Sequence, residues 1–218
     1  SQMGNQGHTT DGVRSIKEWY EAGVLGEVKE IYAWIGEFNF NPGHYWTKPE
    51  SFPPKKDPIP SYLDWDLWLG PAKYRDFNSA YAPKSWRGFY DFGNGQLGDW
   101  ACHTLDGPFW AMDLGMPNSI KVEIPNPRTP YNFVSDQSIV TYNFNNKKDE
   151  SPVTLKWFEG GLKPEILNEL GVNEMDDYKR HGMIMVGDKN TLITGGRPNK
   201  PKLLMPDSEW NEFLINAP

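Results

Sequence analysis

Cysteine is almost absent from this sequence of 218 residues, in which Cys102 stands alone. A single cysteine excludes a disulfide within the chain and any metal site built from clustered cysteines. Histidine is also scarce, with four residues that show neither the H-x-H nor the H-x-x-x-H spacing of a metal site: His8, His44, His103 and His181. The sequence therefore predicts no metal centre.

The chain also lacks an excess of basic residues and has no long apolar run. The chain has 22 lysines and arginines against 29 aspartates and glutamates, which gives a formal net charge of −7. This balance argues against nucleic acid or an anionic membrane surface as the main partner. No apolar run approaches the roughly 20 residues that a membrane span needs. The sequence leaves open whether the protein works in the cytoplasm or the periplasm.

Aromatic residues, in contrast, are abundant: 10 Trp, 10 Tyr and 11 Phe. Aromatic rings suit the binding of sugar rings and protein interfaces, but tryptophan also fills ordinary cores. The count alone therefore indicates no function. With 38% hydrophobic residues, the chain can bury a substantial core in one large domain or two small ones.

The pattern of apolar residues changes from helical to strand-like along the chain. Helices are predicted near residues 10–22 and 99–114, and Pro108 is expected to bend the second. Residues 41–60 are rich in proline and are predicted to form a long irregular loop. An acidic, weakly helical insertion covers residues 162–180. Strands are predicted at 28–40, 119–124, 138–144, 153–158, 183–186 and 191–194. This order indicates an α+β domain with a mostly antiparallel, open-faced sheet and helices packed on one face.

The stretch from Trp86 to Trp110 is the most informative part of the sequence. Behind a glycine-spaced loop it places Asp99, His103 and Asp106 at helical spacing, so that all three fall along one face. A carboxylate and an imidazole beside a glycine loop are typical of an acid/base site. Two structural alternatives remain open: Asp99 caps the N-terminus of the helix, and His103 is a packed core residue.

Within this stretch, Gly93-Asn94-Gly95-Gln96-Leu97-Gly98 matches the dinucleotide pattern G-x-G-x-x-G. A true dinucleotide turn needs a buried apolar strand directly before it. Here the preceding residues read WRGFYDF, with a charge and aromatic residues beside glycine. We therefore expect this loop to face substrate and not a dinucleotide.

Three segments together resemble a known family: GNQGHTTDGVRSIKEWYEAGVLGEVKEIYAW, DWDLWLGPA and WRGFYDFGNGQLGDWACHTLDGPFW. They are similar to the glucose-fructose oxidoreductase, inositol dehydrogenase and MocA (Gfo/Idh/MocA) family of NAD(P)-dependent oxidoreductases. The sequences of these segments look most like those of family members that are common in sugar-degrading Bacteroidetes. The resemblance implies an open-faced sheet like that of the dihydrodipicolinate reductase C-terminal domain.

Family members have an N-terminal Rossmann domain followed by a C-terminal α/β domain, and this chain resembles only the second. Residues 1–10 are then expected to be the remnant of the Rossmann domain and its connection, and residues 11–218 the substrate and oligomerisation domain. The cofactor loop and the Glu-Lys-Pro motif, which carries the family's catalytic lysine, have no counterpart here. NAD or NADP is expected in the full-length protein, and none on this fragment, which we expect to be inactive alone.

The resemblance also implies roles for individual residues. The family's D-x-x-x-H pair falls on Asp99 and His103, with the histidine as general acid/base and the aspartate orienting either the histidine or the substrate. Gly4, Gln6 and His8 match a loop that lies near the nicotinamide. The remaining site candidates are expected to contact a sugar: Trp86, Arg87, Tyr90, Asn94 and Asp106. For each of them a purely structural role in packing is the alternative.

The function implied is oxidation or reduction of a CH–OH group on a sugar or polyol. Two alternatives stay open. One is a related enzyme that cleaves glycosides through transient oxidation with the same cofactor, and the other is a non-catalytic carbohydrate-binding or assembly domain. A partly apolar sheet face, carrying Ile139, Tyr142, Trp157 or their alternates, further predicts a homo-oligomer.

Overall fold

The computed structural model describes residues 4–126 and 132–218 of the chain. The chain divides into two compact units. The first takes the segments Ser1–Glu37, Trp100–Pro125 and Gln137–Pro218, and the second takes Phe38–Asp99 and Asn126–Asp136. Within the described residues, none of the helices has the length and apolar character needed to cross a bilayer.

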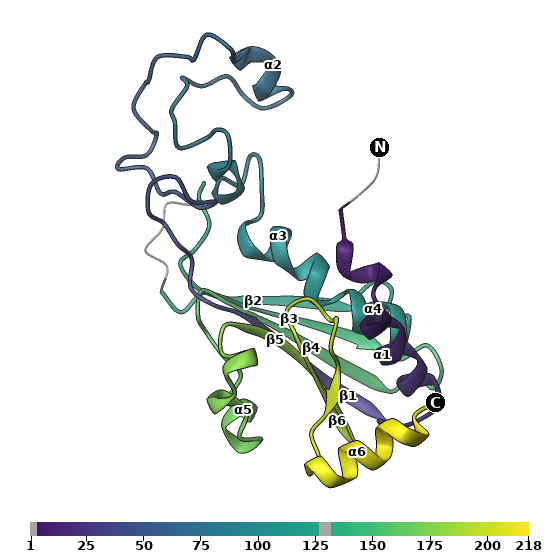
Figure 1. Cartoon of the computed structure of the whole chain (residues 1–218). Helices are drawn as coiled ribbons and strands as arrows, with labels where there is room; N and C mark the ends of the chain where they lie inside the picture. The colour runs from purple at the N-terminus through teal and green to yellow at the C-terminus, as the bar shows by residue number, and fades with distance from the viewer. Residues whose placement is uncertain (1–3, 127–131) are drawn as a thin grey trace. The chain divides into compact units, whose positions relative to one another are not determined.

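A seven-stranded sheet forms the centre of the first unit (Figure 1). Only the β1–β4 pair is parallel, and the other neighbouring pairs are antiparallel. In sheet order the strands are β2 (Ser119–Glu123), β3 (Ser138–Asn145), β4 (Pro152–Glu159), β1 (Val28–Ile35), β5 (His181–Gly187), β6 (Thr191–Gly195) and β7 (Lys202–Leu203). The predicted α+β class and mostly antiparallel sheet are confirmed. The predicted first strand was too long, because β1 ends at Ile35.

Helices α1 (Asp11–Glu21) and α4 (Asp106–Met112) pack on one face of this sheet. Helix α1 buries the apolar stripe that its sequence predicts, including Val13 and Ile16. The negative charge of Asp11 in its first turn interacts favourably with the positive end of the helix dipole. A Cβ at Gly107 of α4 would lie 3.0 Å from Cδ1 of Ile16. Glycine at this position therefore lets the two helices approach closely.

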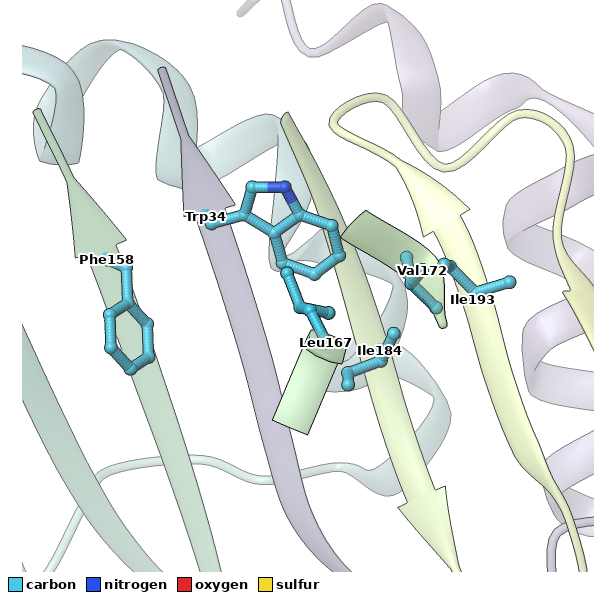
Figure 2. Packing of buried hydrophobic residues seen from close by; sticks show 6 residues of the cluster. All are labelled: Trp34, Phe158, Leu167, Val172, Ile184 and Ile193. Carbon is cyan, nitrogen blue, oxygen red and sulfur yellow. The ribbon is translucent and has the colours of Figure 1, made fainter. Parts of the chain in front are cut away.

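The opposite face of the sheet is covered in part by the acidic insertion. Its short helix α5 (Ile166–Glu169) and the 3₁₀ turns η3 (Val172–Glu174) and η4 (Asp176–Tyr178) follow β4. Figure 2 shows how side chains of the insertion pack over the strands in one buried cluster: Trp34, Phe158, Leu167, Val172, Ile184 and Ile193. The prediction of helices on one face therefore describes α1 and α4, while α5 lies on the other.

The residues predicted to share one exposed sheet face do not all lie together. Successive side chains of a strand point to opposite faces, and Ile139 is paired with Phe158, one position along from the pair Val140 and Trp157. Ile139 therefore lies on the face of α5. Trp157 lies on the α1 and α4 face, as does Tyr142, two positions along from Val140, and Trp157 is fully buried there.

The predicted helix over residues 99–114 is two helices. Helix α3 (Gly95–Thr104) starts four residues earlier than expected, and α4 begins after a break at Leu105. Pro108 does not cause the break, because it is the third residue of α4. A proline is tolerated there, since the first N–H groups of a helix have no intrahelical partner.

A final helix, α6 (Asp207–Asn216), was not predicted. Trp210 and Phe213 of this helix make edge contacts with the ring of Trp19 in α1, at centroid distances of 5.9 and 5.3 Å. No residue of α6 is buried. Its sequence does place Trp210, Phe213 and Leu214 at i, i+3 and i+4, so a local helical signal was present and was overlooked.

The second unit has little regular structure, as the proline-rich excursion predicts. It contains α2 (Trp65–Leu69) and the 3₁₀ turn η2 (Ser85–Gly88). The Asp64 carboxylate caps α2 by accepting the Leu67 N–H at 3.0 Å, which is a typical N-cap bond. An aromatic cluster replaces a sheet as its core, with ring contacts among Trp65, Phe77, Tyr81, Phe89 and Phe133.

Candidate functional site

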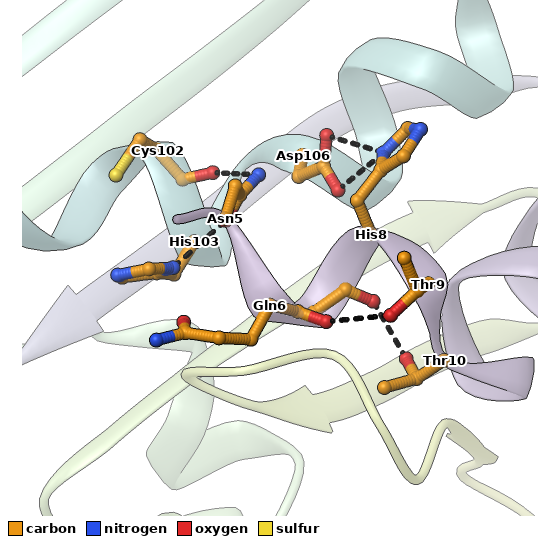
Figure 3. Close-up of polar contacts among 9 residues, drawn as sticks. Asn5, Gln6, His8, Thr9, Thr10, Cys102, His103 and Asp106 are labelled. Carbon is orange, nitrogen blue, oxygen red and sulfur yellow. Dashed lines mark hydrogen bonds and ion pairs between the residues drawn. The ribbon is translucent and has the colours of Figure 1, made fainter. Parts of the chain in front are cut away.

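The His103 imidazole lies in the last turn of α3, just before the break between α3 and α4, and is hydrogen-bonded there (Figure 3). His103 is the last residue but one of this helix and is half-buried. Its Nδ1 lies 2.8 Å from Oδ1 of Asn5, in the N-terminal segment. The same amide donates from Nδ2 to the backbone carbonyl of Cys102 at 3.2 Å. The Asn5 side chain therefore contacts two consecutive residues of the helix end.

A second imidazole pairs with the first residue of α4. Nδ1 of His8 lies 2.9 and 3.1 Å from the two carboxylate oxygens of Asp106. The His8 side chain is 51% exposed and that of Asp106 only 17%. The His8 ring also contacts Trp110 at a centroid distance of 5.3 Å. This pair holds the 3₁₀ turn η1 (Gln6–Thr9) against α4.

Gln6, the other predicted cofactor contact, lies in η1 with an exposed side chain, and Gly4 precedes this turn. The structure therefore places the predicted residues of the N-terminal segment close together in the first unit. Asn5 was not singled out in the sequence, although it lies inside the glycine-spaced run Gly4–His8. Its contact with His103 joins residues 98 positions apart, which no local pattern can indicate.

A third imidazole, His181, stacks on Trp100 at 5.2 Å with an interplanar angle of 25°. The Arg197 guanidinium lies 4.9 Å from the centre of the same indole, and Trp100 in turn contacts the His103 ring edge-on at 6.1 Å. Burial lowers the pKa of His181, and the positive charges of Arg180 and Arg197 lower it further. The His181 ring is therefore held in its neutral form, as a hydrogen-bond acceptor for the Gly196 N–H at 3.2 Å.

The structural alternative for Asp99, a helix N-cap, is wrong. It is the fifth residue of α3 and so lies beyond the first turn, where a side chain cannot act as an N-cap. Its carboxylate accepts a hydrogen bond from Nε of Arg87 at 3.0 Å in the second unit. The Arg87 guanidinium also lies over the rings of Trp86, at 4.5 Å, and Tyr45, at 4.7 Å.

The other predicted sugar contacts lie in the turn before α3. Tyr90 is 49% exposed, and its backbone N–H donates to the carbonyl of Asn132. Asn94 is exposed, and its backbone carbonyl accepts the Gly98 N–H. The structure thus groups Trp86, Arg87 and Asp99 in one cluster of the second unit.

The glycines of the G-x-G-x-x-G match serve close packing within the chain. A Cβ at Gly93 would lie 2.8 Å from Cα of Arg87, and one at Gly95 would lie 2.7 Å from Cγ1 of Val134. Gly95 also has a φ of +60°, which disfavours other residues. Residues 85–88 before this loop form a 3₁₀ turn and not a buried strand. The loop does not fit the phosphates of a dinucleotide.

Comparison with known proteins gives one family. The family described as "Oxidoreductase family, C-terminal alpha/beta domain" (GFO_IDH_MocA_C2) matches residues 9–154, which is 146 of the 218 residues. No curated protein matches the chain.

Several solved structures are similar in fold. A WlbA dehydrogenase from Chromobacterium violaceum, in complex with NADH and UDP-GlcNAcA, is 14% identical with a TM-score of 0.50 over 96% of this chain and 46% of that one. The WlbA dehydrogenase from Bordetella pertussis is also 14% identical, with a TM-score of 0.49 over 98% and 50%. A levoglucosan dehydrogenase in complex with NADH and levoglucosan is 14% identical, with a TM-score of 0.48 over 91% and 41%.

The chain therefore spans about half the length of the solved structures that it resembles. At these identities the likeness concerns the fold alone. The family match is broader, because it covers two thirds of the sequence, from before α1 to the middle of β4. On this match, the chain belongs to the Gfo/Idh/MocA oxidoreductase family, as its C-terminal alpha/beta domain.

Proposed function

We propose that the whole protein is an NAD(P)-dependent oxidoreductase acting on a CH–OH group of a sugar or polyol. This chain contributes the substrate side of its active site, with His103 as the general acid/base. The observation that carries the proposal is the placement of His103. It is half-buried at the end of α3, and Asn5 fixes one of its ring nitrogens at 2.8 Å.

An imidazole suits this role because its ordinary pKa lies near neutrality. Oxidation of a carbinol requires a group that accepts the hydroxyl proton, and reduction requires one that returns it. In this proposal His103 performs both steps, because histidine as a residue type can accept and return a proton near neutral pH.

The dinucleotide supplies the hydride chemistry when the whole protein binds it. The Gly93–Gly98 loop does not fit its phosphates, and we propose that the dinucleotide is bound mainly by residues outside this chain. Gln6 and His8 are proposed to lie on the nicotinamide side. His8 pairs with the carboxylate of Asp106. Trp86, Arg87 and Tyr90 are proposed sugar contacts, because tryptophan and tyrosine rings stack on sugars and guanidinium groups bind hydroxyl oxygens.

Replacement of His103 in the full-length protein tests the proposal. His103→Ala should lower turnover roughly 100-fold or more, the usual scale for a general acid/base, without unfolding the protein. The exposed His44 gives a matched control, and His44→Ala should keep normal turnover.

Near-normal turnover of the His103→Ala variant on its true substrate would contradict the proposal. The assay should follow NADH and released aglycone together. Net NADH formation with a free sugar identifies a dehydrogenase. Release of an aglycone without net change in the cofactor identifies the glycoside-cleaving alternative, and binding without any turnover identifies a carbohydrate-binding domain.

A further inference from the structure

Strand β2 forms one edge of the seven-stranded sheet (Figure 1). Its neighbour on one side is β3, and in the described residues no strand pairs with its other side. All five residues of β2 are exposed, and the exposed fractions are 58% for Ile120 and 57% for Val122. On an edge strand, alternate residues direct their backbone N–H and C=O groups away from the sheet. The side of β2 away from β3 therefore offers both hydrogen-bonding groups and apolar side chains.

The side chains of β2 are divided by type between the two faces of the sheet. Successive residues of a strand point to opposite faces. Val122 is opposite Val140 of β3, so it lies with Ile120 on the α1 and α4 face. Lys121 and Glu123 lie on the other face, where Nζ of the lysine is 2.8 Å from the carboxylate. The edge thus has apolar side chains on one face and two opposite charges on the other.

This order of residues is complementary to itself when two copies run antiparallel. In an antiparallel pair, residues directly opposite one another lie on the same face and their side chains interact. When a two-fold axis passes beside Val122, this residue faces Val122 of the second copy, and Lys121 faces Glu123 of the second copy. The same register places Ile120 opposite Ile124. Two ion pairs on one face and apolar contacts on the other then join the copies.

The neighbouring registers lack this complementarity. When the axis moves by one residue, to Lys121 or to Glu123, that residue lies opposite its own copy, and like charges directly opposite are destabilising. Lysine on an edge strand generally discourages pairing with another chain. In the register centred on Val122, however, the lysine meets a carboxylate. The charges of this edge therefore permit pairing with a second copy and select one register for it.

We propose that the β2 edge binds the β2 edge of a second copy of this chain, antiparallel and centred on Val122, so that the two sheets become one. This interface uses an edge of the sheet and is distinct from any contact through a sheet face. It is also independent of the proposed enzymatic function. Exposed ion pairs contribute little to stability, and β2 is short. We therefore expect a reversible association in which the charges determine the register more than the affinity.

Disulfide cross-linking in the full-length protein tests the register. Val122→Cys should give a covalent dimer on mild oxidation, because the Cα atoms of opposite residues lie about 4.5–5.5 Å apart, within the span of a disulfide. Ile120→Cys is the matched control, with nearly the same exposure on the same face. Its two copies are four residues apart along the strands, or roughly 13 Å, and should not cross-link. Mass spectrometry of the peptides distinguishes this bond from any bond of Cys102.

Charge reversal tests the pairing of the side chains. Lys121→Glu alone should reduce the mass of the assembly to about half in light scattering, because four carboxylates then lie together. Glu123→Lys alone should have the same effect through four ammonium groups. An equimolar mixture of the two variants should recover the mass of the parent, since every carboxylate of one chain then faces an ammonium group of the other.

The outcomes separate the interface from its register. Absence of a disulfide between the two copies of residue 122 would overturn the interface. Equal cross-linking of Ile120→Cys and Val122→Cys would overturn the register, as would a mixture of Lys121→Glu and Glu123→Lys that stays at the lower mass. All four substitutions are at exposed positions, and circular dichroism of each variant should match that of the parent.

Discussion

At the scale of single residues, His181 couples the stability of the first unit to pH. Its ring is packed between Trp100 and the backbone of Gly196, and burial lowers its pKa in the folded state. The unfolded chain therefore takes up the proton first as the pH falls below the ordinary histidine value of about 6.5. By linkage, its contribution to stability is complete above that pH and is lost as the pH falls towards the lower folded-state pKa.

We therefore expect the free energy of unfolding to fall between pH 7 and pH 5, and His181→Gln to reduce this slope. Urea unfolding at several pH values measures the effect, with the exposed His44→Gln as a control that keeps the slope of the parent. An equal slope in the His181→Gln variant and the parent would contradict the prediction.

At the scale of secondary-structure elements, the acidic insertion stabilises the sheet through very few side chains. Leu167 of α5 is 1% exposed and belongs to the cluster with Trp34 and Ile184. Leu167→Ala should lower the free energy of unfolding by about 2–5 kcal/mol, the usual cost of removing a buried leucine side chain. Denaturant unfolding measures the change.

Leu214→Ala is the matched control, because Leu214 lies on α6 and is 50% exposed. Its effect should stay within about 0.5 kcal/mol, as for other surface substitutions. If Leu167→Ala lowers the free energy of unfolding by less than about 1 kcal/mol, α5 contributes little to the core, because truncating a buried leucine to alanine usually costs more.

The elements with strong local patterns could be predicted from the sequence. Helix α1 and strands β2 to β6 have regular apolar periods and lie within one or two residues of the prediction. The break at Leu105 has no such signal, because the apolar pattern continues across it. Helix α6 was missed although Trp210, Phe213 and Leu214 have helical spacing, and only its contacts with Trp19 depend on tertiary structure.

In the candidate site, too, only the features with a local sequence pattern could be predicted. His103 could be named because its spacing from Asp99 and its sequence context are local features. One partner of His103 is the Asn5 amide, 98 positions away in the sequence. Two neighbours of Trp100, His181 and Arg197, lie 81 and 97 positions further along the chain. Such contacts follow from the fold and have no local pattern in the sequence.

At the scale of the whole molecule, we predict self-association through the sheet face that carries α5. This face retains partly exposed apolar side chains beside the insertion, among them Tyr32 and Ile139, and apolar patches commonly form interfaces. Light scattering at tens of micromolar should give a dimer or a larger assembly. Ile139→Glu should shift this assembly towards the monomer.

Ile215→Glu is the control for this experiment, because Ile215 lies on α6 and is 83% exposed. It should leave the assembly unchanged. A strict monomer for the parent chain, or equal effects of the two glutamate substitutions, would contradict an interface on this face.

The order of the sheet also has a consequence for synthesis on the ribosome. Strand β1 lies at the centre of the sheet, yet both of its neighbours come much later in the chain: β4 starts at Pro152, 117 residues after Ile35, and β5 follows at His181. At translation rates of about 5–20 residues per second, the apolar run around Ile31 and Trp34 waits on the order of ten seconds for a partner strand. During that interval its backbone groups and side chains are available to other chains. This nascent strand is therefore the segment where we expect a chaperone to bind first.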